Sequence, residues 1–176
     1  MGLASFRVGI EHLPQPYRML VAALLQSMLR RWGSNLVSLL VFGSVARGDA
    51  RRDSDVDMLV VCRELPRSRF RRQDLFMEVE ESEEVQRIVD ELWSAGYYVD
   101  FSPIMLTVEE ARRFRPIYLD MVQDAVIVYD ENGFMAKILS ELAKKLEALG
   151  AERVWVGKRW YWRLKKDFRF GEVIEL

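Results

Sequence analysis

The chain has 176 residues, half of them hydrophobic and 30% charged, which suits one compact domain with a sizeable core. A formal net charge of −1 offers no general attraction for nucleic acid, and single Cys62 and His12 residues exclude an intrachain disulfide and argue against zinc or serine–histidine chemistry. No run approaches the ~20 apolar residues of a membrane span and the N-terminus lacks a signal-peptide pattern, so we expect a cytoplasmic protein without membrane contact.

The first half of the chain alternates helical patterns with short apolar runs. Over 16–32, apolar residues recur at helical spacing, which predicts an amphipathic helix. Two almost continuously apolar runs, 36–42 and 56–62, predict buried strands. A second helical period predicts one long helix over 68–95, and a strand is expected over 96–102.

The second half continues the alternation. A capping box at 107–110 predicts a helix start, Pro116 introduces a further helix over 117–123, and 125–129 has the composition of a strand. Asn132-Gly133 marks a turn into a last helix, 134–149, and the tail beyond it shows no clear period. This order predicts an α/β fold, a small mixed β-sheet with helices packed on one side.

Two acidic residues open the second predicted strand. Asp55 and Asp57 are two positions apart, so their side chains point the same way, about 7 Å apart along the strand. Two carboxylates at this spacing can hold a hard cation such as Mg²⁺, which takes oxygen ligands and keeps phosphate and water in its shell.

A glycine and a serine end the first predicted strand. Gly43 allows a sharp turn and the close approach of a phosphate to the backbone, and Ser44 adds a hydroxyl donor. The residues that follow can begin a short helix whose free N–H groups form an anion site, and Arg47 or Arg51 can reach a phosphate.

The pattern strand, Gly-Ser, turn, Asp-x-Asp, strand resembles the DNA polymerase β-like nucleotidyltransferase superfamily, most closely its minimal stand-alone prokaryotic members. Gly43, Ser44, Asp55 and Asp57 match the family's pattern in place. The aromatic and basic end of the chain looks like the tail of archaeal stand-alone members. The resemblance implies the nucleotidyltransferase fold, with the two motif strands adjacent and a third acidic strand beside them.

The family places a third acidic residue on a later strand, and the resemblance implies Asp100 for this role. The predicted strand puts Tyr98, Asp100 and Ser102 on one face. Asp120 and Asp124 are competitors, in a segment that has the pattern of a helix running into a loop.

The resemblance further implies a metal-dependent transfer of a nucleoside monophosphate, AMP from ATP above all, with two Mg²⁺ ions. An acceptor hydroxyl attacks the α-phosphorus in line and pyrophosphate leaves. The implied site comprises catalytic and metal-binding carboxylates and a nucleotide-binding group: Asp55, Asp57 and Asp100, and Gly43, Ser44 and Arg47.

The acceptor is not written in the sequence. Small members of the family are often paired with a HEPN-domain toxin that they silence by attaching AMP, so the leading hypothesis is an antitoxin that modifies such a partner protein. One alternative is a nucleotidyltransferase acting on a small hydroxylated molecule, and another is a non-catalytic antitoxin that binds its partner by occlusion. Homo-oligomer formation stays open.

The C-terminal segment interleaves aromatic and basic residues, and we expect it to form an arm, 151–176, beside a nucleotidyltransferase domain, 1–150. An arm docked on the domain, a surface for a partner protein and a platform for nucleic acid each fit this composition. The aromatic residues concerned are Trp155, Trp160, Tyr161, Trp162, Phe168 and Phe170.

Overall fold

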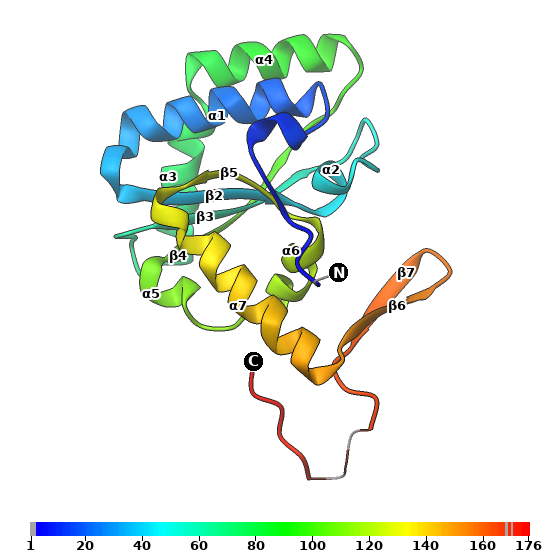
Figure 1. Cartoon of the computed structure of the whole chain (residues 1–176). Coiled ribbons are helices and arrows are strands. Elements are labelled where there is room, and N and C mark those ends of the chain that lie inside the picture. Colours follow the sequence, from blue (N-terminus) through cyan, green and yellow to red (C-terminus); the bar gives the residue numbers. More distant parts are fainter. Residues whose placement is uncertain (1–2, 168, 170) are drawn as a thin grey trace.

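The computed structural model describes residues 3–167, 169 and 171–176, and centres on a five-stranded sheet with the order β1-β5-β2-β3-β4 (Figure 1). Strand β2 is antiparallel to both β3 and β5, while β1–β5 and β3–β4 are parallel pairs. The predicted mixed sheet is therefore confirmed, with the two motif strands adjacent. The strands are β1 (Arg7–Val8), β2 (Leu36–Phe42), β3 (Val56–Cys62), β4 (Phe101–Thr107) and β5 (Val126–Asp130).

Helices cover both faces of this sheet, which corrects the expectation that they pack on one side (Figure 1). In β2, Leu39 and Val41 join one core cluster, while Leu40 and Phe42 join another on the opposite face. All seven β2 residues are buried, and a strand that is apolar on both faces needs a layer on each. One face carries α1 (Tyr17–Trp32), α3 (Arg69–Glu80) and α4 (Glu83–Ser94); the other carries α6 (Ile117–Asp124) and α7 (Phe134–Leu149).

The single helix predicted over 68–95 is wrong, because the chain breaks between α3 and α4. Ser82 has extended backbone angles and is buried, and it serves as the N-cap residue of α4. The Ser82 side chain makes no capping hydrogen bond, while the acidic Glu83 and Glu84 behind it suit the positive end of a helix. The apolar positions before and after Ser82 therefore belong to two helices with separate periods.

The strand predicted over 96–102 is displaced, since β4 runs from Phe101 to Thr107. The residues before it cross the segment that precedes β3, where the Tyr98 N–H donates to the Arg52 carbonyl at 2.7 Å. Asp100 consequently stands just ahead of the strand. Its carbonyl accepts the Val56 N–H at 2.9 Å, which fixes the register of the parallel β3–β4 pair.

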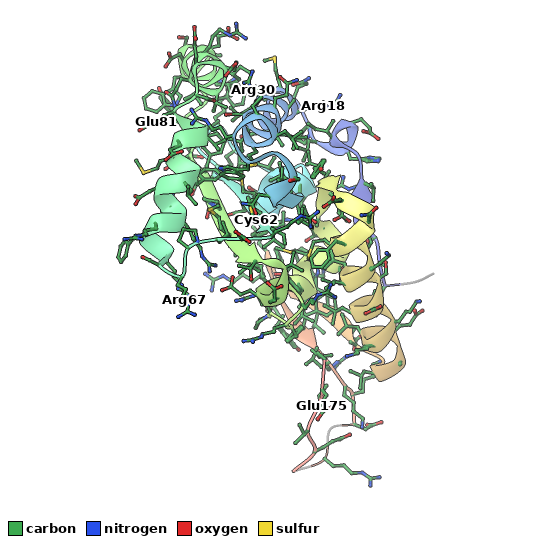
Figure 2. All side chains as sticks on the ribbon, turned by 90° about the vertical axis from the view of Figure 1, so that its left-hand side faces the viewer. Arg18, Arg30, Cys62, Arg67, Glu81 and Glu175 are labelled. Carbon is green, nitrogen blue, oxygen red and sulfur yellow. The ribbon has the colours of Figure 1, made fainter. Side chains whose placement is uncertain are left out.

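The capping box, the end of the last helix and the burial of the second strand are as predicted. The capping box is present, with Thr107 and Glu110 bonding each other's backbone at the start of α5 (Val108–Ala111). Helix α7 ends before Gly150, which has a positive φ of 67°. Cys62 is fully buried, and Figure 2 shows it inside the molecule while Arg67 and Glu81 lie at the outer surface. Within the described residues, no helix has the length and apolar character needed to cross a membrane.

The tail forms a hairpin that its composition did not predict. Strands β6 (Glu152–Val156) and β7 (Arg159–Arg163) pair antiparallel as a separate two-stranded sheet beside α6 (Figure 1). Phe168 and Phe170, which the sequence groups with the aromatic tail, lie outside the described residues. The division of the chain at residue 150 stays a prediction.

The outer edge of β4 is closed to further strand pairing at its first half. Alternate residues of a parallel strand direct their backbone groups to the same side, so Phe101 and Pro103 direct theirs away from β3. The Phe101 N–H donates to the Asp100 carboxylate at 2.8 Å. Pro103 has no N–H to offer, a common protection of edge strands.

An arginine–glutamate pair closes the second half of the same edge. Arg72 donates to the Met105 carbonyl at 2.9 Å and to both oxygens of Glu110, at 2.7 and 3.0 Å. Glu110 in turn accepts the Thr107 N–H. The Arg72 hydrogen bonds lower the pKa of Glu110 to about 2 from an ordinary 4.5, against the opposing effect of burial.

This pair gives the free energy of unfolding a pH dependence. Because the pKa of Glu110 is lower in the folded state, its stabilisation is present above about pH 4.5 and is lost as pH falls through about 2. We expect Glu110→Gln to be less stable than wild type at pH 7 and to lose less stability between pH 5 and 2. Urea unfolding across this range, with exposed Glu109→Gln as control, measures both; an unchanged pH slope in Glu110→Gln contradicts the assignment.

Candidate functional site

Strand pairing brings the two halves of the sequence motif together. Phe42, the last residue of β2, is the register partner of Asp57 in β3, so Gly43 follows directly beside the Asp57 carboxylate. Gly43 has a φ of 71°, and a Cβ built on it would lie 2.4 Å from Asp57 Oδ2. Only glycine accommodates both this backbone conformation and this approach.

The residues after Gly43 form the expected short helix, α2 (Gly43–Arg47). Val45 and Ala46 are buried and fix the helix to the sheet, while Gly43 and Ser44 remain partly exposed. Gly48 ends the helix in a left-handed conformation, with its N–H bonded to the Ser44 carbonyl at 3.0 Å. The first N–H groups of α2 therefore start at the point where Gly43 meets Asp57.

Asp55 and Asp57 stand close enough to influence each other. Burial raises the pKa of Asp57 above its usual value, and the negative charge of Asp55 raises it further. A hydrogen bond from Ser102 and the positive charge of Arg47 act in the opposite direction. Asp57 is half-buried, whereas Asp55 is exposed and immediately precedes β3 instead of lying within it.

Asp100 does not join this carboxylate pair. Its side chain accepts the Phe101 N–H, and it lines a pocket of about 430 Å³ together with Glu80, Trp93 and Tyr98. Burial and the charge of Asp100 raise the pKa of Glu80. Ser102, the register partner of Asp57, takes the place beside it.

The two motif carboxylates fit a hard cation. Mg²⁺ is commonly bound through one or two carboxylates, with substrate phosphates and water completing its shell. Asp55 and Asp57 supply such a pair, and Gly43 contributes no side chain beside Asp57. Among residues 3–167, 169 and 171–176, no group of three or more His, Cys, Asp or Glu side chains is arranged to hold a metal ion.

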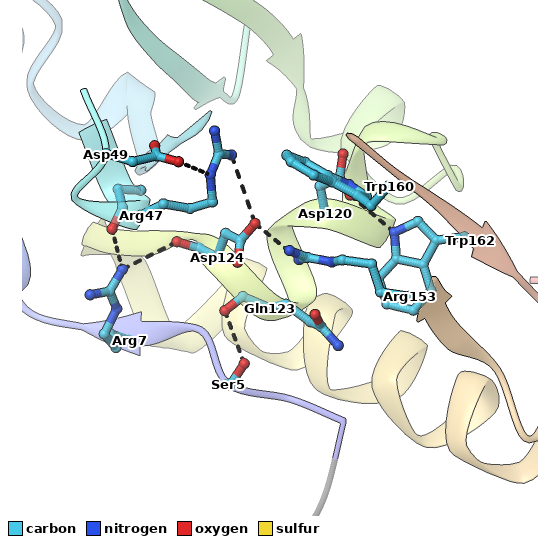
Figure 3. A network of polar contacts seen from close by, with 11 residues as sticks. Ser5, Arg7, Arg47, Asp49, Asp120, Gln123, Asp124, Arg153, Trp160 and Trp162 are labelled. Carbon is cyan, nitrogen blue, oxygen red and sulfur yellow. Dashed lines mark hydrogen bonds and ion pairs between the residues drawn. The ribbon is translucent and has the colours of Figure 1, made fainter. Parts of the chain in front are cut away.

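Arg47 lies in a polar network between α2, α6 and the hairpin (Figure 3). Its guanidinium contacts Asp49 at 3.3 Å and Asp124 at 3.8 Å, and it stacks 4.9 Å from the centre of the Trp160 ring. Sequence reasoning placed Arg47 near the phosphates and missed its contact with the tail.

The two competitors for the third carboxylate are engaged by the same hairpin. Asp120 accepts both indole N–H groups of Trp160 and Trp162, at 2.9 and 3.0 Å. Asp124 pairs with Arg153 at 2.9 Å (Figure 3). Both residues thus anchor β6–β7 to α6.

The motif loop, residues 48–55, is held by aromatic residues on the side that faces away from the hairpin. The Tyr17 hydroxyl donates to the Arg51 carbonyl at 2.7 Å, and burial raises the pKa of Tyr17 above its usual value. The Arg52 guanidinium lies 5.2 Å from the Tyr97 ring centre. These contacts fix the chain just before Asp55.

The Gly43–Asp57 contact makes a stability prediction with a matched control. Gly43→Ala and Gly48→Ala both place alanine at a positive φ, which costs about 1–2 kcal/mol each. Nothing lies within 4 Å of a Cβ at Gly48, whereas a Cβ at Gly43 meets Asp57. We therefore expect Gly43→Ala to lower the free energy of unfolding, measured by urea titration, by about 1–3 kcal/mol more than Gly48→Ala does. Equal losses in the two variants would show that the contact between Gly43 and Asp57 is not tight.

Comparisons with known proteins agree with this geometry. Residues 21–119, more than half of the chain, match the family model described as "Nucleotidyltransferase domain". "Putative protein adenylyltransferase MJ1305" of Methanocaldococcus jannaschii is 27% identical over 120 residues, covering 67% of this chain and 75% of that protein.

Two solved structures are also similar. "Crystal structure of the toxin-antitoxin with AMP-PNP" has a TM-score of 0.40 at 18% identity, covering 71% of this chain and 88% of its own. "Crystal structure the toxin-antitoxin MntA-HepT" has a TM-score of 0.39 at 13% identity, covering 74% and 90%. The family model covers more than half of the chain and includes the whole Gly-Ser and Asp-x-Asp segment, so the chain belongs to the nucleotidyltransferase domain family.

Proposed function

We propose that this nucleotidyltransferase transfers AMP from ATP, with Mg²⁺, to a hydroxyl group of a partner protein. The observation that carries the proposal is the contact of the Gly43 backbone with the Asp57 carboxylate, beside Asp55 and the start of α2. It combines an anion-binding backbone with a cation-binding carboxylate pair, which is what a metal-bound triphosphate requires. The relative named as a protein adenylyltransferase supports AMP as the transferred group.

In this proposal, each motif residue has a separate task. The N–H groups of Gly43 and Ser44, with the Ser44 hydroxyl, bind the triphosphate, and Arg47 adds a cation from the end of α2. Asp55 and Asp57 would hold Mg²⁺, which when bound would neutralise phosphate charge and favour ionisation of the acceptor hydroxyl. The acceptor oxygen forms a bond to the α-phosphorus as the bond to pyrophosphate breaks, and the hydroxyl proton passes to a nearby base or to water.

Asp100 remains the proposed third carboxylate, on the condition that its side chain gives up its present hydrogen bond. Its carboxylate now accepts the Phe101 N–H at 2.8 Å, so it has to leave this bond to reach the Asp57 side. The register places Asp100 level with Asp55, and we expect a rotation of the Asp100 side chain to bring its carboxylate to the metal without a shift of the strand.

A HEPN-domain toxin is the proposed acceptor, with antitoxin action as the biological role. The competing function is a non-catalytic module that binds its partner by occlusion. One observation favours a protein-binding surface in either case: Trp155, Val156 and Tyr161 of the hairpin are each more than half exposed. The two functions differ in whether the motif carboxylates are needed. Transfer to a small hydroxylated molecule is a further alternative.

Transfer of label from each α-³²P-labelled nucleoside triphosphate, with Mg²⁺ and a co-expressed HEPN protein, tests the proposal. We expect ATP to label the partner protein, and Asp57→Asn to lower the rate by at least about 100-fold because it removes a carboxylate that holds the reacting charge. Asp53→Asn is the matched control, since Asp53 is exposed and pairs with Arg51 at the surface.

The outcomes separate the competing functions. Labelling of a small hydroxylated compound instead of protein replaces the acceptor and keeps the enzyme. If no triphosphate gives a labelled product and Asp57→Asn still neutralises the partner, the chain is a binding module and the catalytic proposal is wrong.

A further inference from the structure

The C-terminal hairpin holds the motif arginine in place. Arg47 is the last residue of α2, and its side chain is only 23% exposed. Its guanidinium carbon lies over the Trp160 ring, 4.9 Å from the ring centre, and a guanidinium nitrogen lies 3.8 Å from an Asp124 carboxylate oxygen. A guanidinium held between an indole ring and a carboxylate has few alternative orientations.

The hairpin is docked on α6 through Arg153, Trp160 and Trp162. In the antiparallel register, Arg153 pairs with Trp162 and Trp155 with Trp160, so these four side chains share one side, on which Trp155 is 55% exposed. The Arg153 guanidinium lies within 6.0 Å of the ring centres of all three tryptophans. It is 6% exposed and takes the short contact with Asp124.

The division of contacts leaves the Arg47 charge available. Arg153 lies 2.9 Å from Asp124, whereas Arg47 lies 3.8 Å from the same oxygen. The other partner of Arg47, Asp49, is 62% exposed, so water screens that pair. Arg47 is thus oriented by its neighbours, and its closest carboxylate, Asp49 at 3.3 Å, is one that water screens.

The end of α2 is also tied to the N-terminal strand. Arg7 donates to the Ala46 carbonyl and, at 3.4 Å, to the Asp124 carbonyl (Figure 3). The backbone that carries Arg47 is therefore fixed to α6 on one side, while the hairpin fixes the side chain on the other. What the hairpin adds is the orientation of the guanidinium.

We propose that Trp160 is a positioning residue for Arg47, so that the C-terminal hairpin forms part of the nucleotide-binding site. The inference rests on the proposed function, in which Arg47 contacts the triphosphate. The affinity for the nucleotide therefore depends on whether the C-terminal hairpin, a segment far away in the sequence, is docked on α6. A ligand that lifts the hairpin from α6 lowers that affinity.

A double-mutant cycle measured on Mg·ATP binding tests this. We expect Trp160→Leu to raise the Kd for Mg·ATP about 10-fold by releasing Arg47, and Trp160→Phe, which keeps an aromatic face, to stay within about twofold of wild type. In an Arg47→Ala background, Trp160→Leu should have no further effect. Tyr161→Leu is the control, because Tyr161 is adjacent in sequence but lies on the exposed face of the hairpin.

Calorimetric titration of the full-length variants gives these values, and urea unfolding establishes that each is folded. If Trp160→Leu is unfolded, Trp160→Met carries the same expectation. An unchanged Kd in Trp160→Leu, or the same loss with Arg47 present and absent, overturns the positioning role. The measured quantity is binding, not transfer. A wild-type protein that binds Mg·ATP but transfers no AMP therefore overturns only the proposed reaction and leaves the positioning role of Trp160 to be judged from the Kd values.

Discussion

The site depends on one close contact, between the backbone of Gly43 and the carboxylate of Asp57. The β2–β3 register creates it by pairing Phe42 with Asp57, and the positive φ of Gly43 turns the chain away into α2 at that point. A single turn thereby places backbone N–H groups and a carboxylate side by side. The backbone N–H groups attract an anion, and the carboxylates beside them attract a cation. A metal-bound triphosphate supplies both charges at once.

The rest of the fold holds this contact rigid. The sheet is covered on both faces, so neither motif strand can shift without disturbing a packed core. Tyr17 and the Tyr98 backbone hold the motif loop from the α1 side, while α6 and the hairpin hold Arg47 from the other. The site is thus assembled from both layers and from the end of the chain.

Much of this arrangement was predictable, and the failures have physical causes. The strands 36–42 and 56–62 were found with their observed bounds, because continuous apolar runs leave little ambiguity. The break at Ser82 was missed, since apolar positions on two helices imitated one period. The position of Asp100 was missed because an alternating pattern does not reveal where strand pairing begins. The hairpin did leave a signal in the sequence, the two-residue segment Gly157-Lys158 between two short runs rich in aromatic and β-branched residues, 152–156 and 159–163.

The most direct measurement is the location of the metal in crystals grown with Mn²⁺ and a non-hydrolysable ATP analogue, using the anomalous scattering of manganese. The account predicts a manganese peak at coordination distance from both Asp55 and Asp57, with the phosphates of the analogue against the N–H groups of Gly43 and Ser44. A nucleotide bound elsewhere, or a manganese ion bound without either carboxylate, would contradict it.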